Sequence, residues 1–136
     1  MIYFIAYLST ALIFLIIDAV WLGVVASSFY KAQLGDLMRP DINFAVAALF
    51  YLFYIAGVVF FALKPALESE SYIMAGLYGC LFGFFCYATY NFTNIATIQN
   101  WPVFMSIVDL SWGTFLTGLS AILGYFVTRY AMGAFS

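Results

Sequence analysis

Four long apolar runs alternate with short polar stretches along this chain of 136 residues. The runs cover residues 2–30, 44–63, 72–92 and 102–128. An α-helix needs about 20 apolar residues to cross the roughly 30 Å hydrocarbon core of a bilayer, and each run is long enough. The pattern predicts an all-α, polytopic transmembrane four-helix bundle, with antiparallel neighbours joined by short loops in a single domain of residues 1–136.

The polar stretches predict where the helices end. Residues 31–43 hold four charged residues together with Gly35 and Pro40, and they predict a loop. Lys64-Pro65 predicts the end of the second helix, because proline cannot donate the next backbone hydrogen bond. Residues 92–101 predict an uncharged turn, after which Pro102 suits the first turn of the last helix.

Composition supports a membrane location. Hydrophobic residues make up 67% of the chain and charged residues only 7%, whereas about 25% of the residues of a soluble domain are charged. Most of the outer surface must therefore face lipid. We expect four spans in a cell inner membrane with both termini on one side. Two basic residues fall on each side, Lys31 and Arg39 against Lys64 and Arg129, so the orientation stays open, and the denser pair at residues 31–43 favours the cytoplasm for that loop.

The expected partners are membrane lipids, and a small cationic or apolar ligand and a homodimer are left open. Four basic residues are too few to neutralise nucleic-acid phosphates. The chain has no histidine, which removes Ser-His and Cys-His catalytic arrangements and disfavours zinc and haem. We expect no metal and no cofactor. Cys80 and Cys86 would lie about 9 Å apart along a helix, too far to bridge, and are expected to be buried thiols.

Small residues indicate where two helices can approach closely. Gly76, Gly79 and Gly83 fall on or near one face of the third run, and Gly79-x-x-x-Gly83 is a small-x-x-x-small pattern. On the fourth run, small and polar residues recur at helical spacing and form one stripe. These are Ser106, Asp109, Gly113, Ser120 and Gly124. The glycines fit packing within the chain, and they also fit a homodimer face.

Two carboxylates lie inside apolar runs, and each has a tryptophan three residues later, in the pairs Asp18–Trp21 and Asp109–Trp112. At 1.5 Å per residue, Asp18 lies roughly 18 Å before the 31–43 end of its helix. Asp109 lies roughly 12 Å beyond the turn that precedes its own helix. Both ends are on the same side of the membrane, so the two acids have comparable depth and can face each other.

These acids predict a polar pocket between the first, third and fourth spans. The predicted ligand-binding residues are Asp18, Trp21, Tyr87, Tyr90, Asn91, Asn94, Asp109 and Trp112. A charged residue at the centre of a span costs about 2.5–3.5 kcal/mol, and no basic residue lies at this depth. We therefore expect at least one of the acids to be neutral at pH 7, with pH-dependent behaviour. The alternative is structural: each Asp bonds a Trp or Asn and joins two helices.

Other aromatic residues are expected to serve packing and lipid contact. Tyr30 and Trp101, at the ends of their runs, suit the interfacial belt of a membrane protein. The aromatic residues of the second run are assigned to packing and lipid contact, and they are Phe50, Tyr51, Phe53, Tyr54, Phe60 and Phe61.

Several stretches are similar to a known family. They are FLIIDAVWLGVV, FYKAQLGDLMRP, LFYLFYIAGVVFFALKPAL, and YNFTNIATIQNWP followed by VDLSWG. On these stretches the chain resembles DUF2177, a family of small bacterial polytopic membrane proteins of unknown function. The resemblance implies an inner-membrane protein and supplies no catalytic residue. It supports family-type positions at Asp18, Trp21, Asn91, Thr93, Asn94, Trp101, Pro102, Asp109, Trp112 and Gly113.

Three functions remain open at this point. The first is binding or transport of a small ligand or cation, because paired acids with aromatic walls suit an organic cation. The second is a structural or assembly subunit that docks another membrane protein. The third is an intramembrane enzyme acting on a lipid-like substrate, which the residue types limit to proton transfer by the two acids.

Overall fold

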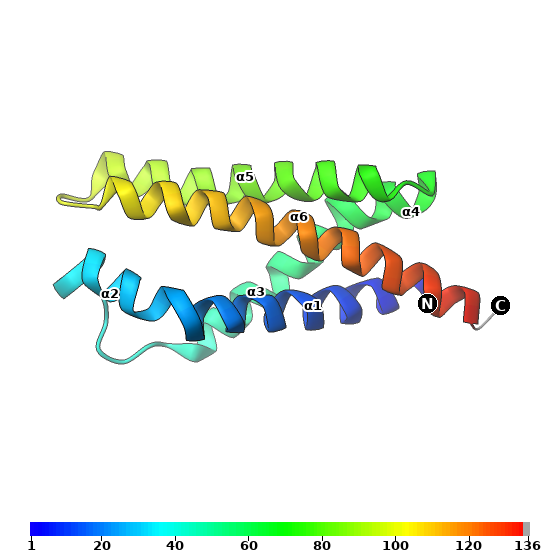
Figure 1. The fold of residues 1–136 in the computed structure, drawn as a ribbon, viewed down its shortest axis with the longest axis horizontal. Helices are drawn as coiled ribbons and strands as arrows, with labels where there is room; N and C mark the ends of the chain where they lie inside the picture. The colour runs from blue at the N-terminus through cyan, green and yellow to red at the C-terminus, as the bar shows by residue number, and fades with distance from the viewer. Residues whose placement is uncertain (135–136) are drawn as a thin grey trace.

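A computed structural model describes residues 1–134 of the chain, and every regular element among them is helical (Figure 1). The first rod contains α1 (Ile2–Trp21), a π-helical turn η1 (Leu22–Ala26), α2 (Ser27–Leu34) and a short 3-10 turn η2 (Gly35–Leu37). The second rod contains α3 (Phe44–Val58), a π-helical turn η3 (Val59–Leu63) and α4 (Lys64–Ser69). Two uninterrupted helices follow, α5 (Tyr72–Thr97) and α6 (Val103–Ala134).

Four of these stretches are long and apolar enough to cross a membrane. They are Ile2–Leu37, Phe44–Ser69, Tyr72–Thr97 and Val103–Gly133. Large hydrophobic side chains such as Phe53, Ile73 and Phe104 are exposed on the outside of the bundle, where lipid rather than water would meet them. The prediction of an all-α transmembrane bundle with four spans is therefore confirmed.

The helices continue beyond the predicted spans. The first rod does not end at residue 30, because Lys31–Leu34 are still helical and the 3-10 turn follows. Lys31 and Gln33 are good helix formers, so leaving the apolar run does not end the helix. It ends at Gly35, whose φ of 56° is in the region that favours glycine. In the same way, α5 continues to Thr97, so the predicted turn at residues 92–101 is confined to the residues after Thr97.

The predicted end of the second helix at Lys64-Pro65 is wrong. The chain passes through the π-helical turn η3, in which the Lys64 N–H bonds to the Val59 carbonyl five residues back. Proline breaks an α-helix because its ring meets the carbonyl four residues earlier. The wider π turn makes room for that ring, so α4 continues to Ser69. It ends at Glu70, which has a left-handed φ of 52°.

One close pair of helices forms the centre of the bundle, and the second rod runs obliquely from α1 across to α5 (Figure 1). Helices α5 and α6 lie side by side, and α6 passes over α1 towards the chain ends. The glycine face of α5 makes the close approach: a methyl group on Gly83 would meet the Gly113 carbonyl, and one on Gly79 would meet Ala121. This face is therefore occupied within the chain.

The polar site is placed by the way α3 runs. This helix starts beside α1, and its rod approaches α5 only near η3 and α4, so the start of α3 diverges from the end of α5 (Figure 1). The loop after α2 and the turn before α6 lie at one end of the bundle, and the start of α1 lies near the end of α6 at the other. Between these ends, Phe14, Ile55 and Leu116 are almost completely buried and fill the centre.

Candidate functional site

Asp18 lies near the end of α1 and is 8% exposed. The Tyr51 hydroxyl, from α3, donates a hydrogen bond of 2.7 Å to its Oδ2. The Trp112 indole N–H, from α6, donates a longer one of 3.4 Å to its Oδ1. This one carboxylate therefore links three of the four rods.

Asp109, on α6, also accepts hydrogen bonds from two other rods. The Tyr30 hydroxyl, from α2, donates to its Oδ1 at 2.8 Å. The Asn91 amide, from α5, donates to its Oδ2 at 2.9 Å and also bonds the Tyr87 carbonyl at 2.9 Å. Asn91 is 2% exposed, and its hydrogen bond to the Tyr87 carbonyl holds the amide in place from within α5.

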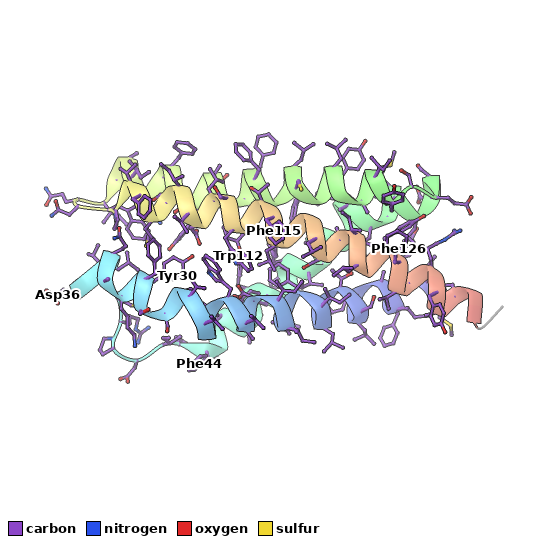
Figure 2. The ribbon with its side chains drawn as sticks, viewed as in Figure 1. Tyr30, Asp36, Phe44, Trp112, Phe115 and Phe126 are labelled. Carbon is purple, nitrogen blue, oxygen red and sulfur yellow. The ribbon has the colours of Figure 1, made fainter. Side chains whose placement is uncertain are left out.

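The two tryptophans that follow the acids meet each other. The rings of Trp21 and Trp112 are stacked with centroids 4.3 Å apart and planes 11° from parallel. Residues three apart on a helix lie on the same face. Each tryptophan therefore lies on the same face of its helix as the acid that precedes it, and the two Asp–Trp pairs face the same interior space. Figure 2 shows Trp112 and Tyr30 in the space between the α5–α6 pair and the α1–α2 rod.

Both acids line one cavity of about 260 Å³, which we call the acid-pair cavity. Its walls are mostly aromatic, and Leu34 and Met38 extend it towards the loop after α2. Apart from those two residues, its lining consists of Asp18, Trp21, Leu22, Tyr30, Tyr51, Tyr87, Tyr90, Met105, Asp109 and Trp112. The Trp21 indole N–H is buried and makes no hydrogen bond with a described residue, although it interacts electrostatically with the Tyr30 hydroxyl.

A second cavity of about 510 Å³, which we call the lateral cavity, lies next to the first. The two cavities share Tyr87, Tyr90 and Asp109. The rest of the lateral cavity is lined by Val46, Phe50, Tyr54 and Cys86, from α3 and α5. It lies where α3 diverges from α5.

The charges of the site are unbalanced. No Lys or Arg is among the residues that line either cavity. The four carboxylate oxygens instead accept hydrogen bonds from uncharged groups, namely two tyrosines, one asparagine and one tryptophan. The pair Arg129–Glu70, 3.0 Å apart, joins the end of α6 to the turn before α5, away from the site. Among the described residues no group of three or more metal-ligating side chains is present.

Seven of the eight predicted ligand-binding residues belong to this arrangement. Six of them line the acid-pair cavity, and Asn91 holds Asp109. Asn94, one turn beyond Asn91 on α5, is not among the lining residues.

Sequence reasoning missed the second span's contribution. Tyr51 was assigned to packing and Tyr30 to the interfacial belt, yet each donates a short hydrogen bond to one of the two intramembrane carboxylates. The sequence indicates that an intramembrane acid needs hydrogen-bond donors, but it does not select these two tyrosines from the 11 in the chain.

The comparisons with known proteins support the membrane assignment alone. The sequence model of a family described as "Predicted membrane protein (DUF2177)" matches residues 3–126. No curated protein matches the chain, and no solved structure does.

Proposed function

We propose that this chain, which belongs to the DUF2177 family of predicted membrane proteins, binds a small organic cation within the membrane. The proposal is based on the geometry of the site. The observation that carries the proposal is the acid-pair cavity, which has two carboxylates and a mainly aromatic wall but no basic residue among its lining. An ammonium group would offset the two acids, and aromatic rings attract such a cation.

Hydrogen bonds from neutral groups leave the charge of the site in place. Tyrosine, asparagine and tryptophan donors stabilise a carboxylate without neutralising it. Two uncompensated negative charges in a low-dielectric interior are costly, so at least one acid is expected to be neutral in the empty site, and a monovalent cation between the two lowers the cost of ionising both. The volume of about 260 Å³ is slightly below the range for drug-sized ligand sites, which is about 300–1,000 Å³. A compact head group is therefore the appropriate ligand.

The shape of the interior favours binding over a continuous path. One helical turn from Asp18 towards the chain ends, Phe14 is completely buried and contacts the rings of Tyr51 and Tyr54. Leu116 and Ile55 are buried beside it in the same core. The cavity is thus closed on that side by packed hydrocarbon.

Radiolabelled choline, a compact trimethylammonium ion, tests the proposal in equilibrium binding to the purified protein in lipid nanodiscs. We expect saturable binding that is weakened about tenfold or more by Asp18→Asn and by Asp109→Asn, since loss of one close charge contact removes about 1.4 kcal/mol or more. The uncharged isostere 3,3-dimethylbutan-1-ol should not compete.

Glu70→Gln is the matched control, because it removes one carboxylate at the opposite end of the bundle and should leave choline affinity unchanged. Absence of saturable binding to the wild type would refute the function. Choline binding at wild-type affinity in both aspartate variants would also refute it, and the acids would then serve only to join helices.

A further inference from the structure

The lateral cavity has no part in holding the cationic head group, although it is larger than the acid-pair cavity and adjoins it at Asp109, Tyr87 and Tyr90. Its remaining lining residues, Val46, Phe50, Tyr54 and Cys86, carry no charge. A cavity of this kind suits an apolar group that is attached to whatever occupies the acid-pair cavity.

The lateral cavity also reaches the surface that faces lipid. Val46 and Phe50 are 61% and 56% exposed and lie within the second span, Phe44–Ser69. Their exposed sides are therefore at the level of the bilayer, and the start of α3 diverges from α5 there (Figure 1). Tyr90, which both cavities share, is 54% exposed. A ligand chain in this cavity would be continuous with the surrounding lipid.

We propose that the ligand is an amphiphilic amine, whose ammonium head lies between Asp18 and Asp109 while its hydrocarbon chain lies in the lateral cavity between α3 and α5. This inference rests on the proposed function, because it takes the cation in the acid-pair cavity as given. The ligand enters from the bilayer, head group first, and Tyr87 and Tyr90 form the wall that head and chain share.

Competition by alkyltrimethylammonium ions of increasing chain length, from ethyl to decyl, tests the assignment against radiolabelled choline in nanodiscs. Partitioning of each ion into lipid is the same for every protein variant, so the decyl-to-ethyl affinity ratio is compared between variants. Val46→Trp fills the mouth of the lateral cavity from α3, and Cys86→Phe fills it from α5. We expect each to lower this ratio about tenfold, the effect of about two methylene groups losing their apolar contacts.

Leu49→Trp is the matched control, because Leu49 is 54% exposed on the same helix and lines neither cavity. It should leave the ratio at the wild-type value, and choline itself should bind all three variants alike. If choline binds and the ratio is the same in every variant, the lateral cavity does not hold the chain and only this inference fails. If choline does not bind the wild type, the proposed function fails and this inference fails with it.

Discussion

Each intramembrane carboxylate accepts two hydrogen bonds from uncharged side chains, one from its own half of the chain and one from the other half. Asp18 is bonded by Tyr51 from residues 1–70 and by Trp112 from residues 71–136. Asp109 is bonded by Asn91 from its own half and by Tyr30 from the first half. The acids therefore join the two helical hairpins as well as lining a cavity, and their removal affects both properties.

A double-mutant cycle measures the contact between Tyr30 and Asp109. We expect Tyr30→Phe and Asp109→Ala to show a coupling energy of about 0.6 kcal/mol, and no more than about 1.7, which is the range for polar contacts within membrane proteins. The free energy of unfolding in mixed detergent micelles is the measured quantity.

The control cycle pairs Asp109→Ala with Tyr7→Phe. The Tyr7 hydroxyl bonds the Leu52 carbonyl, so this pair should be additive. Equal coupling in the two cycles would show that the hydrogen bond between Tyr30 and Asp109 has no energetic significance.

Residue types alone predicted the acids but could not select all their donors. Asp18 and Asp109 were identifiable because carboxylates inside apolar runs are rare, and counting residues from the loops brought them to similar depth. Tyrosine gives no comparable signal among the 11 in this chain, because the same side chain suits a core, a lipid surface or an interfacial belt. Tyr30 and Tyr51 therefore could not be told from the other tyrosines without coordinates.

At the scale of the elements, the π-helical turn η1 explains why Tyr30 was missed. In a regular α-helix Tyr30, twelve residues after Asp18, would lie roughly 120° around the axis from it, at about 100° per residue. A π turn accommodates one extra residue. It thereby brings Tyr30 to roughly 20° from the Asp18 direction, where its hydroxyl reaches Asp109. Hydrophobic periodicity does not reveal such a turn.

The rotation of Tyr30 by η1 predicts how adding or deleting one residue in the first rod changes choline affinity. Deletion of Gly23, an exposed residue of η1, should convert the π turn to α-helix and leave Tyr30 on the Asp18 side. Insertion of one alanine after Gly23 should turn Tyr30 roughly 100° away. We expect the deletion variant to keep its affinity for choline within about twofold, and the insertion variant to lose about tenfold or more.

Gly23→Ala provides the control for a change of side chain at the same position, because a methyl group there meets nothing within 4 Å. Far-UV circular dichroism should give the same helix content for all three variants. The account of η1 is incorrect if the deletion weakens binding as much as the insertion does.

The second π turn, η3, explains why the end of the second helix was predicted wrongly. Lys64-Pro65 is a conventional signal for the end of a helix, and the prediction was wrong because the π turn η3 lies directly before it and the rod continues through Pro65 in α4. In contrast, the apolar runs were sufficient to predict the number of spans, because lipid leaves a backbone few alternatives to the helix.

At the scale of the whole molecule, the chain divides into two hairpins at the turn after α4. The hairpins meet where α6 crosses α1 and where α5 packs on η3 and α4, and two hydrogen bonds to the acids cross between them. We expect residues 1–70 and 71–136, expressed together as separate chains, to associate and copurify.

The double variant Tyr30→Phe with Trp112→Phe removes both donors that reach an acid from the opposite hairpin. At about 0.6 kcal/mol for each hydrogen bond, it should weaken the association of the fragments several-fold, as measured by energy transfer between labelled fragments in micelles. Tyr7→Phe, which affects a bond inside the first fragment, should not change it. Unchanged association in the double variant would show that the hydrogen bonds to the two acids do not contribute to holding the hairpins together.

Each acid accepts one hydrogen bond from the other hairpin, and this has a consequence during synthesis of the chain. The first hairpin leaves the ribosome before the second exists, so Asp18 enters the bilayer with Tyr51 available and its indole partner not yet made. Until the last span is made, Asp18 therefore has only one of its two hydrogen-bond donors, and the bilayer holds an incompletely bonded acid.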